Sequence, residues 1–283
     1  ESRLGGDAGD LTTPFGKGGY EIATLGVGGI LQMVDAVMKN EITNGYALVR
    51  PPGHHAVADL GMGYCLFANG SIAAKYAQQK YGVSRIAVVD WDVHHGNGTQ
   101  DIFYDDPNVL TISIHQDRLY PHDSGLRDEI GSGVAAGTNL NIPLSAGVGN
   151  AGYEKAFDDV VIPALLKFKP ELIFVASGFD SCVFDPLGRM LLTANGYAAL
   201  TKRLMQVANQ VAAGRIVMTH EGGYNAVYSP ICGQAVLQEL VGVKLLADPF
   251  ADSVDHYPSH ALNQVQLQEI NAAAELLVNL PAH

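Results

Sequence analysis

Positive charge is scarce in this sequence. Lysine and arginine together number 17 among 283 residues, against 29 aspartates and glutamates, so the formal charge is −12 at pH 7. A surface with this balance, and no run of lysine or arginine, would repel phosphate backbones and anionic lipid headgroups. We therefore expect no nucleic-acid partner and no membrane partner, whereas basic peptides and cationic small molecules are compatible with the chain.

Cysteine is rare as well. Cys65, Cys182 and Cys232 are odd in number and widely spaced, so they fit neither a disulfide framework nor a paired-cysteine metal site. The sequence has no basic and apolar leader, and no apolar run is expected to reach the roughly 20 residues that span a bilayer. Together these features predict a cytoplasmic protein.

Hydrophobic residues make up 47% of the chain, enough to bury a large core in a single domain over residues 1–283. Short apolar runs predict strands at 46–49, 85–89, 109–114, 172–176 and 215–219. Amphipathic patterns predict helices at about 19–39, 69–81, 150–168, 194–212 and 226–240. This alternation predicts an α/β fold with an open, mostly parallel sheet and helices on both faces.

Histidines and carboxylates gather where the predicted strands end. They follow all five strands, at His54 and His55, at Asp90, Asp92, His94 and His95, at His115, at Asp180, and at His220 with Glu221. Ligands of open parallel sheets bind beyond the carboxyl ends of the strands. We therefore expect these loops to converge on one site.

Asp92 and His94 are two residues apart, so both side chains can point the same way at the end of a strand. Asp180 would supply a third ligand from another strand. Two carboxylates and one imidazole suit Zn²⁺ and leave a fourth position open for water, as a catalytic zinc requires. The alternative is that Asp92 and His94 are turn residues that bond the backbone, and the surrounding motifs favour zinc.

His54 and His55 follow two prolines and a glycine, which stiffen the backbone. Such a pair suits general base and acid catalysis near neutral pH, with Asp90 holding one ring in its tautomer. Tyr224 follows two glycines, and its hydroxyl can donate to a carbonyl oxygen that gains negative charge. The alternatives are a structural histidine pair and an ordinary turn.

Four motifs together resemble the histone deacetylase family, in particular bacterial class II histone deacetylase-like amidohydrolases. They are RPPGHHA at 50–56, DWDVHHGNGT at 90–99, SGFD at 177–180 and EGGY at 221–224. The resemblance extends from about Gly5 to Val241 and implies the arginase/deacetylase fold. It also implies hydrolysis of acetyl-lysine, an acetyl-polyamine or a related small acyl-amine by a zinc-activated water. We expect the family's N-terminal portion, several tens of residues long, to be missing from this chain.

The resemblance implies a role for each motif residue. Asp92, His94 and Asp180 match the zinc ligands, and His54, His55, Asp90 and Tyr224 match the catalytic groups. Asn97 stands at the partner position of the second histidine, where class I relatives have aspartate, which agrees with a class II assignment.

The resemblance also implies an acyl-lysine tunnel formed by Gly63, Tyr64, Tyr120 and Leu187. The family usually has phenylalanine at the two aromatic positions, so two tyrosines predict a more polar channel. Family members bind K⁺ in addition. The matching oxygens of a first potassium site belong to Asp90, Asp92, His94, Ser113 and Ile114, and those of a second to Phe103, Asp106 and Val109.

Two other functions are compatible with this fold. An arginase-like hydrolase would need further ligands for two manganese ions, but Trp91, Val93 and residues 181–184 are poor manganese ligands. An inactive module that only binds acyl-lysine would be indicated by loss of Tyr224 or of a zinc ligand, and all of these residues are present. A homo-oligomer is compatible with the sequence, which contains no feature that fixes the number of chains.

Overall fold

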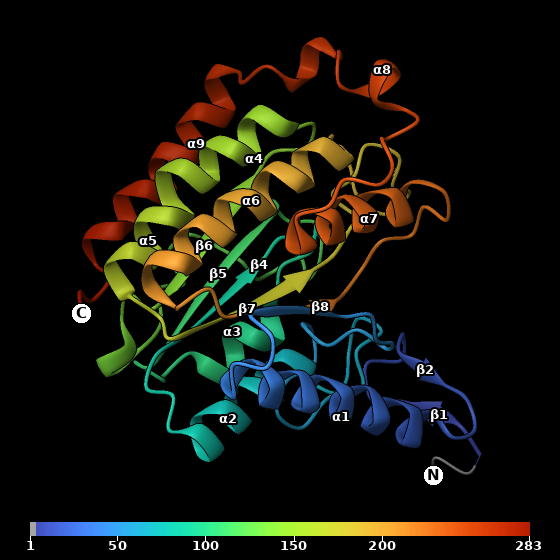
Figure 1. Ribbon diagram of the computed structural model, residues 1–283, viewed down its shortest axis with the longest axis vertical. Coiled ribbons are helices and arrows are strands. Elements are labelled where there is room, and N and C mark those ends of the chain that lie inside the picture. The colour runs from blue at the N-terminus through green and yellow to red at the C-terminus, as the bar shows by residue number, and fades with distance from the viewer. Residues whose placement is uncertain (1–3) are drawn as a thin grey trace.

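Six parallel strands form the central sheet of the computed structural model, which describes residues 4–283 (Figure 1). The strands are β3 (Asn44–Ala47), β4 (Ile86–Asp90), β5 (Val109–Gln116), β6 (Asn139–Leu144), β7 (Leu172–Ser177) and β8 (Ile216–His220). Their order across the sheet is β3-β8-β7-β4-β5-β6, and every neighbouring pair is parallel. The predicted open parallel sheet is confirmed.

All five predicted strands are present, with ends that differ from the predicted ones by up to two residues. The sequence analysis missed β6, because two asparagines and Pro143 interrupt its apolar pattern. Proline is tolerated there because β6 is an edge strand. The short pair β1 (Gly6–Asp7) and β2 (Pro14–Phe15) was also missed, since two-residue strands carry no periodicity.

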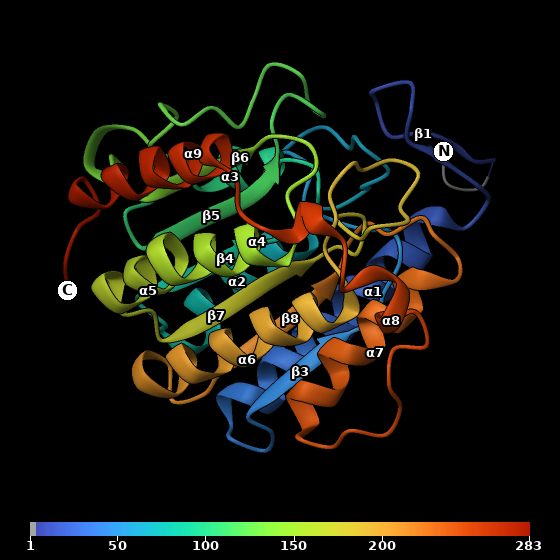
Figure 2. The ribbon, with the colours of Figure 1, turned by 90° about the horizontal axis from the view of Figure 1, so that it is seen from above.

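Helices cover both faces of the sheet, as predicted (Figures 1 and 2). One face is covered by α1 (Gly19–Met38), α2 (Asn69–Tyr81) and α3 (Asn97–Phe103). The other face is covered by α4 (Asn150–Ala156), α5 (Ile162–Phe168), α6 (Ala194–Val211), α7 (Tyr228–Val241) and α9 (Gln264–Ala274), and the short α8 (Ala251–Val254) follows α7.

The helix predicted over 150–168 is interrupted at its middle. A π-helical turn at Phe157–Val161 separates α4 from α5, and Pro163 follows directly at the start of α5. Proline has no N–H to donate to the preceding turn. The predicted helix is therefore present as two α-helices, and the wider turn lies just before the proline.

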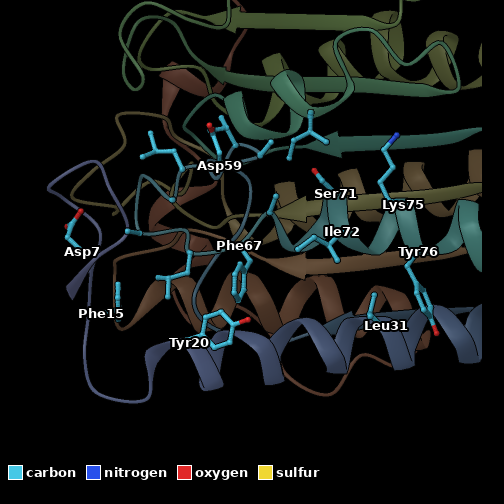
Figure 3. Close-up of a pocket in the computed structure, with 18 of the residues that line it drawn as sticks. Asp7, Phe15, Tyr20, Leu31, Asp59, Phe67, Ser71, Ile72, Lys75 and Tyr76 are labelled. Atoms are coloured by element: carbon cyan, nitrogen blue, oxygen red, sulfur yellow. The ribbon is translucent and has the colours of Figure 1, made fainter. Parts of the chain in front are cut away.

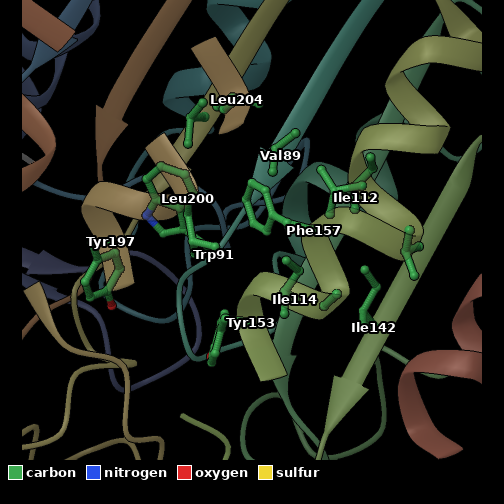
Figure 4. Close-up of a cluster of buried hydrophobic side chains, with 14 of the residues drawn as sticks. Val89, Trp91, Ile112, Ile114, Ile142, Tyr153, Phe157, Tyr197, Leu200 and Leu204 are labelled. Atoms are coloured by element: carbon green, nitrogen blue, oxygen red, sulfur yellow. The ribbon is translucent and has the colours of Figure 1, made fainter. Parts of the chain in front are cut away.

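The larger hydrophobic core lies between the sheet and α4, α5 and α6 (Figure 4). Trp91 is fully buried there, with its ring centroid 6.3 Å from those of both Phe157 and Tyr197. Side chains alternate along an extended chain. Because the side chain of Trp91 points into this core, the side chains of its neighbours Asp90 and Asp92 point away from it.

One prediction about membranes needs correction. By length and composition alone, the 20-residue α1 would be able to cross a bilayer, although no such segment was expected. Core helices of soluble proteins meet the same two criteria, so a single helix of this kind is weak evidence. In this fold α1 packs against α2, β3 and β8 through the buried residues Ala23, Val27, Ile30, Val34 and Val37.

Candidate active site

The candidate site lies beyond the carboxyl ends of β4, β7 and β8. Asp90 at the end of β4 is in register with Ala176 of β7, and Ser177 is in register with His220 of β8. The loops that leave these strands therefore start side by side. The predicted convergence is confirmed for the ends of these three strands.

The three predicted metal ligands lie together. One ligand atom each from Asp92, His94 and Asp180 falls within 4.8 Å of the others. Nδ1 of His94 is 3.0 Å from Oδ1 of Asp92 and 3.1 Å from Oδ2 of Asp180. Both carboxylates are fully buried.

Main-chain donors fix the two carboxylates. Val93 N donates to Oδ1 of Asp180 at 2.8 Å, and Gly222 N donates to Oδ2 of Asp92 at 2.8 Å. A Cβ at Gly222 would lie 2.1 Å from Oδ2 of Asp180, so only glycine allows this approach. Oδ2 of Asp180 itself is buried without a hydrogen-bond partner.

The charges of the ligand cluster favour a cation. Burial, with the neighbouring Asp92 carboxylate, raises the pKa of Asp180 to about 7. Burial would lower the pKa of His94, but its close contacts with the Asp180 and Asp92 carboxylates outweigh burial and raise that pKa to about 11. The two carboxylates thus stabilise a positive charge on the His94 ring. An unsatisfied buried oxygen in a nitrogen and oxygen donor set fits a metal such as zinc.

The tandem histidines lie beside these ligands with their ring centroids 3.9 Å apart. Nδ1 of His54 is 2.9 Å from Oδ2 of Asp90, and Nδ1 of His55 is 2.7 Å from Oδ1 of Asn97. Both oxygens accept, so each ring carries hydrogen on Nδ1. Each histidine therefore has the partner that the resemblance implied, one charged and one neutral.

The two rings differ in their affinity for a second proton. Burial would lower the pKa of His54, but the charges of Asp92 and Asp90 outweigh it and raise the pKa to about 10. For His55, burial and the neighbouring His54 place the pKa well below its usual value. His55 is therefore the neutral imidazole of the pair.

The histidine loop is held by a residue whose role the sequence analysis missed. The buried Glu221 accepts from Gly53 N at 2.6 Å and from His54 N at 3.1 Å through Oε2. Thr219 donates to its other oxygen at 2.8 Å. The EGGY motif contained this glutamate, but its contacts join residues more than 160 positions apart, which no local pattern reveals.

A cavity of about 310 Å³ leads to the site. Its lining contains the four predicted tunnel residues together with His55, His94 and Tyr224, and in addition Thr12 and Leu119, which were not predicted. The ring of Tyr120 packs edge-on against that of His55, with ring centroids 4.9 Å apart. The rings of Tyr64 and Tyr224 also pack edge-on, with centroids 6.2 Å apart. Burial, with Asp92 and Asp180 nearby, raises the pKa of Tyr224, so its phenol keeps its proton.

A larger cavity, of about 770 Å³, lies between α1, α2 and residues 57–68 (Figure 3). Its lining is mostly apolar and includes Tyr20, Phe67 and Ile72. None of the predicted catalytic, metal or tunnel residues lines it. Size alone would therefore have pointed to the wrong place, and the chemistry identifies the smaller cavity.

Three other histidines from the strand ends have structural partners. His95 bonds Ser124 and Gln100, His115 bonds Ser113 and the carbonyl of Gly125, and His220 bonds the hydroxyl of Tyr46. None of them lines the cavity that leads to the site.

The potassium sites stay a prediction. Asp90 and Ser113 are register partners on β4 and β5, close to the metal ligands. In the second group, the carbonyl of Phe103 accepts from Asp106 N, and the carbonyl of Asp106 accepts from Val109 N. These contacts place the two sets of oxygens but do not test whether K⁺ binds.

Comparison with known proteins adds independent findings. The histone deacetylase domain family matches residues 2–240. A histone deacetylase-like amidohydrolase from Pseudomonas aeruginosa is 44% identical over 99% of this chain and 74% of its own length. A probable deacetylase from Archaeoglobus fulgidus is 40% identical over 87% of this chain and 68% of its own length. The solved HDA15 HD domain superimposes with a TM-score of 0.84 at 33% identity, covering 97% of this chain and 74% of that one.

Proposed function

This chain belongs to the histone deacetylase family, and from that premise we propose that it is a zinc-dependent hydrolase. Its substrate would be acetyl-lysine, an acetylated polyamine or a related small acyl-amine. The observation that carries the proposal is the buried cluster of Asp92, His94 and Asp180 at a cavity that His55 and Tyr224 also line.

Asp92, His94 and Asp180 would hold the zinc ion. When bound, zinc acts as a Lewis acid on the amide carbonyl and lowers the pKa of the attacking water. Two carboxylate ligands balance the charge of the ion, and their main-chain donors Val93 and Gly222 keep them in place before it binds.

His55 would transfer the proton, and His54 would assist beside it. His55 is neutral and carries its hydrogen on Nδ1, so Nε2 can accept the proton of the attacking water. The same nitrogen then delivers that proton to the leaving amine, and hydrolysis yields the free amine and the carboxylic acid. His54, bonded to Asp90, stays in a fixed tautomer and stabilises negative charge in the transition state.

Tyr224 would donate a hydrogen bond to the carbonyl oxygen as negative charge develops there. Its raised pKa keeps the donor protonated. Tyr64, Tyr120 and Leu187 line the cavity and would align an acylated alkyl chain while limiting the entry of water.

The proposal is tested by Tyr224→Phe, which removes one hydroxyl and keeps the ring. Loss of one oxyanion donor typically costs on the order of 10² to 10³ in turnover, so kcat on an acetyl-lysine peptide should fall by about that factor. Substrate affinity should barely change, because the donor acts mainly once charge has developed. The measurement is kcat and KM for both proteins, with zinc counted in each.

A variant as active as the parent would contradict the proposed role of Tyr224. A fall in kcat accompanied by loss of zinc would show a structural defect instead. Acetyl-lysine binding without turnover in the parent would favour the inactive module.

A further inference from the structure

The turn that carries Tyr224 needs an external support. Two glycines precede this tyrosine. Gly223 has a backbone φ of 128°, which residues with a side chain rarely adopt. Gly222 is held by Asp92 and by Phe179. The contact that holds the main chain of Tyr224 comes from a different loop, the one that follows β7.

That contact is made by Asp185, which is only 8% exposed. Its Oδ2 accepts from Tyr224 N at 2.6 Å. Its Oδ1 accepts from Leu187 N at 2.9 Å and from Gly188 N at 3.3 Å. One carboxylate thus joins the main chains of two residues, Tyr224 and Leu187, whose side chains both line the active-site cavity.

The loop that carries Asp185 is itself firmly placed. A Cβ at Gly188 would lie 2.2 Å from the carbonyl oxygen of Asp180, so the loop packs directly on the main chain of a metal ligand. Phe184 packs edge-on against Tyr228, with ring centroids 5.1 Å apart, and its carbonyl accepts from Nδ2 of Asn225 at 2.9 Å. Asn225 therefore provides a second link between the same two segments.

We propose that Asp185 is a positioning residue for the reaction. By holding the Tyr224 main chain to the loop of Leu187 and Gly188, it sets where the phenol hydroxyl stands relative to the substrate carbonyl. The inference rests on the proposed role of Tyr224 and adds the group that makes this role geometrically possible.

The substitution Asp185→Asn separates the hydrogen bond to Tyr224 from those to Leu187 and Gly188. The amide keeps one oxygen, which we expect to stay on Leu187 and Gly188 because it accepts two hydrogen bonds there. The amide nitrogen then faces Tyr224 N, and a donor cannot accept from another donor. Since displacement of a catalytic group by about 1 Å can cost 10²-fold, kcat should fall by about ten- to a hundredfold, with KM and zinc content little changed.

The decisive readout is the same substitution in a Tyr224→Phe background. If Asp185 acts through the phenol hydroxyl, Asp185→Asn should lower kcat in the parent and have little further effect once the hydroxyl is gone. An equal fall in both backgrounds, a loss of zinc, or an unchanged kcat in the parent background would overturn the inference. The substrate is an acetyl-lysine peptide in every case.

Two further variants serve as an alternative to Asp185→Asn and as a control. Asn225→Asp keeps an oxygen that can accept from Val227 N and Tyr228 N at the start of α7, but a carboxylate cannot donate to the carbonyl of Phe184. We expect a smaller fall in kcat than with Asp185→Asn, and this fall should also vanish in the Tyr224→Phe background. This variant tests the inference even if Asp185→Asn does not fold. Glu269→Gln is the matched control, because this α9 carboxylate accepts from Ser145 N at 3.0 Å and does not line the cavity. It should leave kcat unchanged. A Tyr224→Phe variant with parental kcat would contradict the proposed role of Tyr224, on which the inference rests. A fall in kcat in Tyr224→Phe but not in Asp185→Asn would refute only the role of Asp185.

Discussion

At the residue scale, one difference in chemistry separates the two histidines. Asp90 is charged and Asn97 is neutral, although both accept a hydrogen bond from Nδ1 of a histidine. Nδ2 of Asn97 also lies 3.4 Å from the carbonyl of His55, which fixes the orientation of the amide. Burial and the neighbouring His54 lower the pKa of His55, and the neutral Asn97 adds no negative charge to oppose them. A weakly basic ring suits the proposed role of taking and then releasing a proton.

Asn97→Asp tests this asymmetry. A carboxylate beside Nδ1 favours the protonated ring, so it should raise the pKa of His55. Since the base must be neutral to act, the acidic limb of the profile of kcat/KM against pH should move to higher pH, with the largest loss of activity below neutrality. The measurement is the pH profile of both proteins. A limb that moves to lower pH or stays in place would contradict the assignment of His55 as the base.

The motif residues could be read from the sequence, whereas their supports could not. His54, His55, Asp92, His94 and Asp180 stand out because their residue types and spacing are unusual. Glu221 and Asp185 are acidic residues like many others until the fold brings Gly53 and Tyr224 against them. Contacts across 168 and 39 residues leave no local pattern in a sequence.

At the scale of elements, the ends of the strands determine the site. The strands were predictable because they are continuous apolar runs, and parallel pairing then places their loops side by side. β6 escaped prediction because its asparagines serve a polar network, in which Nδ2 of Asn139 and of Asn141 bond Oε1 of Gln100. Tertiary contacts thus overrode the local pattern there.

Glu221 joins two elements, the end of β8 and the histidine loop, and its burial predicts a pH-dependent stability. Burial raises its pKa to about 7, against the opposing effect of His54 and of the Gly53 N–H. The folded pKa therefore lies above the ordinary value of 4.5. Stability from the protonated form is fully present below that ordinary value and is lost as the pH rises to about 7.

Glu221→Gln should remove this dependence while keeping the acceptor for Gly53 and His54. The free energy of unfolding of the parent, relative to that of the glutamine variant, should fall between about pH 4.5 and 7. Urea unfolding of both proteins across this range, at equal metal content, measures the difference. A relative stability of the parent that grows with pH would mean that Glu221 is ionised throughout.

At the scale of the whole molecule, the sheet brings four distant segments to one place. Residues near 54, 92, 180 and 224 meet because β3, β4, β7 and β8 are parallel and share one end. The family resemblance predicted the architecture correctly, and the comparisons confirm it. The parts that local patterns do not encode are the short strands β1 and β2, the edge strand β6 and the cavity wall formed by Thr12 and Leu119.

The most direct test of the central claim is a metal count combined with reconstitution of activity. We predict one zinc ion per chain, loss of acetyl-lysine hydrolysis after chelation, and its return with one equivalent of zinc. Asp180→Ala should bind no zinc, because it removes one of three ligands. Two manganese ions per chain with hydrolysis of arginine, or full turnover in metal-free protein, would contradict the account.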